Sequence, residues 1–403
     1  MSVRAPPPPP PWAQQLTAVG VTGTNGKTST TSAIAALLAE LARPVARVTT
    51  LGCFLDEARL NVAPHYAGFL ETMQRCRDAG GRYASIELTS EALALGFARA
   101  WPWRIGVFTN LSHDHSDAHG SMEHYLASKA QLFMALPAGA VAVLNARDAN
   151  AELIAEVTPA GVEIIRYAVP SRGELWAEAD LAAHSIRLDT SGTHFELQST
   201  PRFPGLPRAW SIRAIGDVFV ENALAALAAA LAASVPVDRA AAVLSSSAPP
   251  EGRFELVRRQ PYVVVDYAHT PDALSRTLAT ARQLCEGTLT VVFGAGGNRD
   301  RAKRPLIGAA ARAADRIVLT SDNPRDEDPR AIVDQIAEGI GAHANLSRDL
   351  DRKRAIQLAL RDAGAKDWVL IAGKGHEHHQ ETAGVTTAFS DAAIVRELDE
   401  DRG

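Results

Sequence analysis

The chain has 403 residues and a formal net charge of −5, with 46% hydrophobic and 22% charged residues. This length allows two or three domains with sizeable cores. The slightly acidic balance gives no electrostatic reason to expect nucleic acid or an anionic membrane as a partner, and no apolar run reaches the ~18 residues of a membrane span.

The N-terminal segment MSVRAPPPPPPW has one arginine followed by six prolines, and it lacks the apolar core of a secretory signal. We expect residues 1–16 to form a disordered, extended polyproline tail. Cys53, Cys76 and Cys285 are odd in number and far apart, so they predict neither a disulfide framework nor a C-x-x-C metal site. This cysteine usage fits a reducing, cytoplasmic setting.

Short apolar runs alternate with Ala- and Leu-rich stretches after this tail. LTAVGVTG, VARVTT, YASIEL, IGVFTNL and GAVAVLNA predict strands, and KTSTTSAIAALLAELA predicts a helix between the first two. Such alternation is typical of a parallel sheet covered on both faces. We therefore predict an α/β fold in which residues 17–245 form a first domain with a mostly parallel sheet.

Residues 160–213 have a different pattern. VEIIRYAV, AHSIRLDT, THFELQST and AWSIRAI alternate like hairpin strands, which predicts a small antiparallel sheet inserted in or flanking the first domain. A long helix is predicted over 220–235, and the turn-rich SSSAPPEGRFELV that follows predicts a hinge.

Residues 246–403 predict a second, Rossmann-like α/β domain. Its buried-type strands TLTVVFGAG, RIVLTSDNP and DWVLIAGKG each run into a polar or glycine-containing loop. Ligands of open α/β sheets bind beyond the carboxyl ends of such strands, so these loops form a candidate site.

The segment VTGTNGKTST, residues 21–30, resembles a phosphate-binding loop with a displaced glycine. The pattern G-x-x-x-x-G-K-[ST] needs glycine at position 21, where this chain has Val21. The context still fits, because a strand precedes the loop and a helix begins at Lys27 and Thr28. Lys27 is placed to reach the β- and γ-phosphates, and the Thr28 hydroxyl to bind Mg²⁺.

A histidine cluster occurs in SHDHSDAHG, where residues 113–119 include His113, His115 and His119. It is similar to the H-x-H-x-D-H signature of two-zinc hydrolases of the metallo-β-lactamase type. Ala118 stands where that signature has its third histidine, which weakens the zinc interpretation. A histidine ligand to nucleotide-bound Mg²⁺ and a polar surface turn are the alternatives.

Eight segments then occur in one order: TGTNGKTST, ELTSEAL, FTNLSHDHSDAHGSMEHYLASKAQLF, EGRFE, DYAHTPDAL, FGAGGNRDRAKRP, SDNPRDEDP and GKGHEHHQ. Over residues 17–395 they resemble the successive motifs of the Mur ligases, specifically the MurE type. The resemblance implies an ATP-dependent amide-forming ligase in which a carboxylate attacks the γ-phosphate to give an acyl phosphate. An amino acid's amine then displaces phosphate, as expected of an acid–amino-acid ligase in peptidoglycan or peptide biosynthesis.

The resemblance assigns the ATP and Mg²⁺ sites residue by residue. The phosphate loop is Gly23, Thr24, Asn25, Gly26, Lys27 and Thr28. Two Mg²⁺ sites are implied, with Thr28, Glu87, His115 and Lys129 as ligands or ligand-orienting groups. Lys129 matches the lysine that the family carbamylates, which converts a cation into an anion and requires a neutral amine.

The remaining nucleotide contacts implied by the resemblance are Asn222 for adenine, and Arg253, Asp266 and His269 from the second domain. The resemblance thus makes residues 17–245 a central ATP-binding domain with a phosphate-loop-type sheet. The distribution of the nucleotide contacts over two domains implies closure around ATP.

A diamino-acid pocket is implied at Arg299, Asp322, Asn323, Arg325, Gly373 and Glu377. The DNPR segment resembles the version associated with meso-diaminopimelate, in which arginines pair with the distal carboxylate and Glu377 meets the distal ammonium.

The sequence departs from the family at the acceptor end. The proline tail stands where MurE enzymes have a uridine-nucleotide-binding domain. Val62 and Ala63 replace the hydroxyls of a T-T-P segment, and Thr89-Ser90-Glu91 replaces S-S-H. We therefore expect an acceptor other than the UDP-linked muramyl dipeptide, taken up by a monomeric enzyme.

Three alternatives remain at this point. One is ordinary MurE activity, with the missing domain supplied by a partner chain or omitted by a truncated gene model. A second is a non-catalytic, ATP-binding relative, and a third is the zinc hydrolase.

Overall fold

The computed structural model describes residues 6–63, 65–112 and 121–400. The chain divides into two compact units, Met1–Ala248 and Pro249–Gly403, called here the N-terminal and C-terminal units. Among the described residues, no helix combines the length and apolar character needed to cross a membrane.

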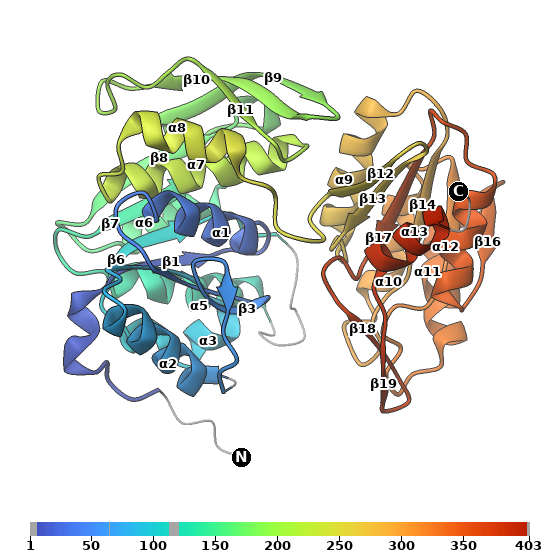
Figure 1. The fold of residues 1–403 in the computed structure, drawn as a ribbon, viewed down its shortest axis with the longest axis horizontal. Coiled ribbons are helices and arrows are strands. Elements are labelled where there is room, and N and C mark those ends of the chain that lie inside the picture. The colour runs from blue at the N-terminus through green and yellow to red at the C-terminus, as the bar shows by residue number, and fades with distance from the viewer. Residues whose placement is uncertain (1–5, 64, 113–120, 401–403) are drawn as a thin grey trace. The chain divides into compact units, whose positions relative to one another are not determined.

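The N-terminal unit is built on a sheet with strand order β11-β10-β9-β8-β7-β6-β1-β5-β2-β3-β4 (Figure 1). The strands are β1 (Thr17–Thr22), β2 (Val45–Thr49), β3 (Gly52–Leu55), β4 (Ala58–Arg59), β5 (Tyr83–Glu87), β6 (Trp103–Phe108), β7 (Val141–Asn145), β8 (Glu163–Ala168), β9 (Leu181–Asp189), β10 (Gly192–Ser199) and β11 (Ala209–Ile212). From β9 through to β2 neighbouring strands are parallel, and the pairings at both ends of the sheet are antiparallel.

Helices cover both faces of this sheet, because successive strand residues point to opposite sides. Val19 and Val21 pack with Ile34 of α1 in one core, whereas Ala18 packs with Phe133 of α5 in the other. The helices are α1 (Lys27–Leu38), α2 (His65–Asp78), α3 (Ser90–Ala94), α5 (Met122–Met134), α6 (Asn150–Val157), α7 (Asp217–Ala232) and α8 (Val237–Ser246). α1, α7 and α8 lie on the first face, and α2, α5 and α6 on the second.

Two details of the N-terminal unit differ from the sequence predictions. β8 was expected to be a hairpin strand, but it pairs parallel to β7, because α6 provides a crossover between them. The antiparallel strands β9, β10 and β11 continue the main sheet and do not form a separate one.

The expected disordered tail also ends before residue 16. Pro11–Gln15 form a 3₁₀ helix, η1, and Trp12 packs edge-on against Trp101 with 5.6 Å between ring centroids. Arg77 lies over the Trp12 ring, and Leu16 is buried. Aromatic burial therefore orders the segment immediately after the prolines.

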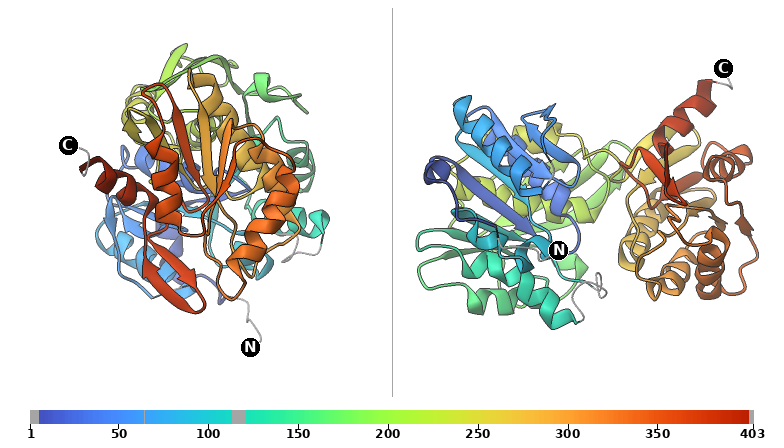
Figure 2. Two further views of the ribbon diagram at one scale, coloured as in Figure 1. Left: turned by 90° about the vertical axis from the view of Figure 1, so that its right-hand side faces the viewer. Right: turned by 90° about the horizontal axis from the view of Figure 1, so that it is seen from below.

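The C-terminal unit, gold to red in Figure 2, has the strand order β12-β13-β17-β14-β15-β16, parallel except for β12 with β13. The strands are β12 (Glu255–Arg259), β13 (Tyr262–Asp266), β14 (Leu289–Phe293), β15 (Arg316–Leu319), β16 (Leu346–Arg348) and β17 (Trp368–Ala372), and a separate hairpin consists of β18 (His379–Thr382) and β19 (Val385–Ala388). The helices are α9 (Pro271–Leu284), α10 (Lys303–Ala311), α11 (Pro329–Ile340), α12 (Arg352–Arg361) and α13 (Asp391–Glu400).

The order of these strands gathers the predicted loops at one edge of the sheet. β17, β14 and β15 are adjacent and parallel, so the loops that follow them leave from neighbouring carboxyl ends. The prediction that these loops share an edge is therefore confirmed.

Candidate active site

Two glycines explain the spacing of the phosphate loop between β1 and α1. Gly23 and Gly26 have φ values of 150° and 83°. A Cβ at Gly23 would lie 1.9 Å from Thr109 Oγ1, and one at Gly26 would lie 2.3 Å from Asn222 Oδ1. The loop thus needs glycine at positions 23 and 26, whereas position 21 is a buried core position of β1.

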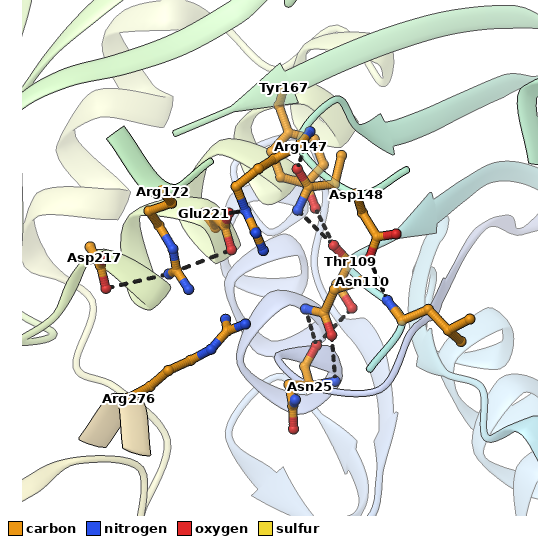
Figure 3. Close-up of polar contacts among 12 residues, drawn as sticks. Asn25, Thr109, Asn110, Arg147, Asp148, Tyr167, Arg172, Asp217, Glu221 and Arg276 are labelled. Atoms are coloured by element: carbon orange, nitrogen blue, oxygen red, sulfur yellow. Dashed lines mark hydrogen bonds and ion pairs between the residues drawn. The ribbon is translucent and has the colours of Figure 1, made fainter. Parts of the chain in front are cut away.

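The end of β6 holds the phosphate loop in place (Figure 3). Asn110 Oδ1 accepts from the Asn25 backbone N–H at 2.9 Å, and the Asn110 carbonyl accepts from the Thr24 N–H at 2.7 Å. The Asn25 carbonyl accepts from Thr109 Oγ1 at 2.7 Å and from Asn110 Nδ2 at 3.1 Å. These bonds fix the direction of the loop backbone, which is the part that cradles phosphate.

Two lysines approach the same loop from different elements. Lys27 is the first residue of α1, and its Nζ donates to the Thr24 carbonyl at 2.8 Å. Lys129 comes from α5, is 1% exposed, and donates from Nζ to the Gly23 carbonyl at 2.7 Å. Its ammonium also lies 4.3 Å from the centroid of the Tyr125 ring. The structure therefore brings Lys27 and Lys129, predicted from distant segments, to one loop.

Thr28 and Glu87 form the oxygen pair expected of a Mg²⁺ site. Thr28 Oγ1 donates to Glu87 Oε2 at 2.9 Å, and the same carboxylate oxygen accepts from the Thr50 N–H at 3.2 Å. Mg²⁺ prefers oxygen ligands and is usually held by one or two carboxylates together with substrate phosphates, so this pair fits the ion.

Within the part of the chain that the structure describes, no group of three or more His, Cys, Asp and Glu side chains gathers as a metal site. His115, predicted as a further metal ligand, lies outside the described residues, as do His113 and His119.

Asn222 lies on α7 beside a buried ion-pair network. The Asn222 side chain packs against Gly26 and is 7% exposed. The adjacent Glu221 accepts from Arg147 Nε at 2.9 Å and lies 3.6 Å from Arg172 Nη1 (Figure 3). Arg172 also pairs with Asp217 at the start of α7. The network fixes the start of this helix, and with it Asn222.

In the C-terminal unit, Tyr267 is the centre of the predicted nucleotide contacts. The Arg253 guanidinium lies 4.5 Å from the Tyr267 ring centroid, and the His269 and His376 rings lie 4.6 and 4.8 Å from it. Burial, followed by the charges of Arg253 and two other histidines, lowers the pKa of His376 from 6.5 to about 4. His376 is therefore neutral near pH 7.

Asp266, also predicted as a nucleotide contact, uses its carboxylate within the protein. It accepts from the Phe254 N–H at 2.7 Å, the Ala268 N–H at 2.9 Å and Thr277 Oγ1 at 3.0 Å. Burial raises the pKa of this carboxyl against the opposing effect of these hydrogen bonds. Its geometry is that of a residue that shapes the loop carrying His269.

The loops after β15 and β17 meet through Asn323 and Glu377. Asn323 Nδ2 donates to Glu377 Oε2 at 2.7 Å, and Lys374 Nζ donates to Asn323 Oδ1 at 2.9 Å. Asp322 and Gly373 also approach closely, because a Cβ at Gly373 would lie 2.6 Å from Asp322 Oδ2. Four of the six residues predicted for the amino-acid pocket are thus brought together.

Arg299 lies in the loop after β14, and Arg325 approaches this loop from the loop after β15. A Cβ at Gly296 would lie 3.1 Å from Arg325 Nη1 and 3.6 Å from Arg299 Cγ. Arg325 donates to the Gly297 carbonyl at 2.7 Å and pairs with Glu381 of β18 at 3.2 Å.

The buried Arg304 of α10 connects the loops after β14 and β15. Arg304 is 0% exposed, pairs through both terminal nitrogens with Glu327, and donates to the Gly296 carbonyl at 3.2 Å. Hydrogen bonding to Arg304 is the main reason why the pKa of Glu327 falls from 4.5 to about 2.

The sequence matches two domain families that are found together. The Mur ligase middle domain matches residues 21–230, and the glutamate ligase domain of Mur ligases matches residues 252–375. The chain belongs to the Mur ligase family. Membership makes it a relative of ATP-dependent amide-forming ligases, as the motifs indicate, and not of the two-zinc hydrolases.

The relatives of this Mur ligase include curated UDP-N-acetylmuramoyl-L-alanyl-D-glutamate–2,6-diaminopimelate ligases. The protein from Aquifex aeolicus (strain VF5) is 39% identical over 393 residues, covering 96% of this chain and 78% of the relative. That from Bacillus velezensis (strain DSM 23117 / BGSC 10A6 / LMG 26770 / FZB42) is 37% identical over 395 residues, covering 95% and 78%.

Solved structures agree with this Mur ligase fold. A diaminopimelate ligase of the same description superimposes with a TM-score of 0.65 at 34% identity, covering 96% of this chain and 79% of that one. Folylpolyglutamate synthase of Mycobacterium tuberculosis shares the fold, with a TM-score of 0.72 at 22% identity over 96% of this chain and 91% of that one.

Several residues at the site were not singled out from the sequence. They are Thr109, Asn110, Tyr267, Lys374 and Glu381. All except Glu381 lie within the segments FTNLS, DYAHTP and GKGHE that carried the resemblance. The sequence motifs therefore included these residues, but nothing in the sequence assigned them a role.

Proposed function

We propose that this Mur ligase uses ATP to join a diamino acid to a carboxylate acceptor through an acyl phosphate. The observation that carries the proposal is the arrangement around one loop, where Lys27, Lys129 and the Thr28–Glu87 pair approach the backbone of residues 23–26. Oriented N–H groups, lysines and hard oxygen ligands are the set that phosphoryl transfer requires.

The proposed reaction has two steps. An acceptor carboxylate oxygen attacks the γ-phosphorus, the bond to ADP breaks, and an acyl phosphate forms. The amine nitrogen of the amino acid then attacks the acyl carbon, the C–O bond to phosphate breaks, and the amine loses a proton. The loop N–H groups and Lys27 stabilise charge that develops on phosphoryl oxygens. Mg²⁺ held by Thr28 and Glu87, with His115 as a further ligand, would neutralise part of that charge.

Lys129 is the proposed carbamylation site. Its amine is buried at the phosphate loop beside Gly23, so a carbamate there would place an anion near the bound cations. Mass spectrometry of the intact protein at raised bicarbonate tests this. One added CO₂ on wild type and none on Lys129→Met is the expected result, whereas no adduct on either protein would contradict it.

The amino acid is proposed to carry both an ammonium and a carboxylate at its distal end, like the 2,6-diaminopimelate named for the relatives. Glu377 supplies a carboxylate for the ammonium, and Arg299 and Arg325 supply guanidinium groups for the carboxylate. Lysine and ornithine lack the distal carboxylate, so they are expected to be poorer substrates.

The acceptor is proposed to differ from UDP-linked muramyl dipeptide. Val62 and Ala63 have no hydroxyl to donate, and the Ala63 carbonyl packs where a Cβ on Gly68 of α2 would lie, 1.8 Å away. Glu91 is exposed in the first turn of α3, where its carboxylate repels an anionic acceptor. These side chains favour a less anionic carboxylate, such as a smaller peptide.

ADP release with purified protein, a panel of amino acids and candidate acceptors tests the proposal. We expect turnover that requires both an amino acid and an acceptor, and mass spectrometry of the products identifies the new amide. Full turnover of UDP-linked muramyl dipeptide at micromolar KM would overturn the acceptor proposal. ATP binding without turnover under any combination would overturn the ligase proposal itself.

A further inference from the structure

Lys374 is a buried lysine in the loop after β17 that the proposed chemistry does not use. It is 0% exposed. Its Nζ donates to Asn323 Oδ1 at 2.9 Å and to Glu377 Oε2 at 3.1 Å. A buried ammonium is stable only when such partners replace water, and both partners here are residues assigned to the amino-acid pocket.

The first consequence of Lys374 is the orientation of the Asn323 amide. Asn323 Oδ1 accepts from Lys374 Nζ and from the Glu381 backbone N–H at 3.0 Å. The opposite orientation would face an NH₂ group toward these two donors, so the oxygen position is determined. Asn323 Nδ2 must then point to the other side, where it donates to Glu377 Oε2 at 2.7 Å.

The second consequence concerns the two carboxylate oxygens of Glu377. Oε2 accepts from both Lys374 and Asn323. Oε1 has no hydrogen-bond partner among the described residues, and the side chain remains 23% exposed. Two donors on one oxygen hold the carboxylate plane and leave Oε1 for a ligand.

We propose that Lys374 is a positioning residue for substrate selection: through Asn323 and Glu377 it directs Glu377 Oε1 toward the distal ammonium of the diamino acid. Because Lys374 is fully buried, it acts through these neighbours and does not itself touch the substrate. The inference rests on the proposed function, since it requires a substrate with a distal ammonium.

Steady-state kinetics with three amino acids test the inference. Diaminopimelate has a distal ammonium and a distal carboxylate, 2-aminopimelate lacks the distal ammonium, and lysine lacks the distal carboxylate. Lys374→Met removes the donor but keeps an unbranched side chain of nearly the same length. We expect the KM for diaminopimelate to rise roughly 10- to 100-fold, which is the effect of losing hydrogen bonds to a charged group.

The decisive quantity is the ratio of kcat/KM for diaminopimelate to that for 2-aminopimelate. This ratio should fall in Lys374→Met by about the same 10- to 100-fold factor, while the KM for ATP stays unchanged. Lys366→Met is the matched control, because Lys366 forms an exposed pair with Glu286 in the same unit. It should leave all these quantities as in wild type.

Asn323→Asp provides an independent variant if Lys374→Met does not fold. An aspartate keeps acceptors for Lys374 and the Glu381 N–H but replaces the Nδ2 donor with an oxygen that faces Glu377. The same ratio should fall in this variant.

An unchanged ratio in the folded variant, or an equal loss for both amino acids, would overturn the positioning role while the ligase activity of wild type stands. Wild type without turnover on any of the three amino acids would overturn the proposed function, and the inference with it.

Discussion

The phosphate loop and the amino-acid loops hold their functional side chains in different ways. In the N-terminal unit, Lys27 and Lys129 donate to backbone carbonyls of a short loop. In the C-terminal unit, Lys374 and Arg325 pair with the carboxylates of Glu377 and Glu381. Backbone groups of such a loop can bind a phosphate group without further selectivity. A site built from paired side chains can instead select one amino acid among several.

The largest expected effect comes from removing a cation at the phosphate loop. Lys27→Ala should lower kcat at least ~10³-fold, because the loop N–H groups stabilise the charge that develops on the phosphoryl oxygens less well without the ammonium of Lys27. The loop backbone remains held by Asn110, so thermal unfolding should stay near that of wild type. ADP release measures the first quantity and circular dichroism the second.

Lys366→Ala, an exposed lysine paired with Glu286, is the control and should keep full activity. Residual turnover of Lys27→Ala close to that of wild type would show that the loop does not carry the chemistry.

The next largest effect is expected in the buried ion pairs beside Asn222. Glu221→Ala leaves Arg147 and Arg172 without their shared carboxylate, so unfolding in urea should show a loss of ~3 kcal/mol. Glu196→Ala removes an exposed partner of Arg208 and should cost much less stability than Glu221→Ala. Equal losses in the two variants would contradict the structural role of Glu221.

A smaller effect that depends on pH is expected from Glu327 in the C-terminal unit. Because its pKa is lowered from 4.5 to about 2, the ionised carboxylate stabilises the fold above pH 4.5, and this contribution is lost as the pH falls toward 2. Glu327→Gln should be less stable by ~2 kcal/mol at pH 7.

Urea unfolding between pH 2 and 4.5 measures this difference, and the variant should show a weaker pH dependence than wild type across that window. Identical slopes would mean that the hydrogen bonds from Arg304 do not lower the pKa of Glu327 in the folded state.

The smallest effect is expected where a protein carboxylate competes with the substrate. Glu381→Gln removes the partner of Arg325 but leaves the bond to the Gly297 carbonyl. The KM for diaminopimelate should fall roughly twofold to fivefold, since this half-buried pair contributes little. Asp334→Asn, in an exposed pair with Arg348, is the control and should change nothing. A raised KM would make Glu381 a substrate contact instead.

The difference between a contiguous loop and side chains that meet from distant segments explains what the sequence could predict. The phosphate loop is contiguous, so its strand, glycines, lysine and helix start were visible in one ten-residue segment. The gathering of the loops after β14, β15 and β17 also followed from sheet topology. The bond between Lys374 and Asn323 joins residues 51 apart in sequence, and no local pattern identifies such a partner.

The prediction for β8 failed for a related reason. An alternating strand has the same appearance in a hairpin and inside a parallel sheet, and only α6 before it decides the direction. His115 stays a prediction, because its segment lies outside the described residues.

The hairpin of β18 and β19 has a further consequence for the rate of amide hydrogen exchange. Isolated hairpins are marginal in water, and every residue of β19 is exposed. Its attachment includes the Arg325 backbone, which donates to the Glu381 carbonyl at 3.1 Å and accepts from the Ala383 N–H at 2.6 Å. Deuterium should therefore enter β19 by local opening long before it enters β14 or β17, and a bound amino acid that engages Arg325 should slow that entry.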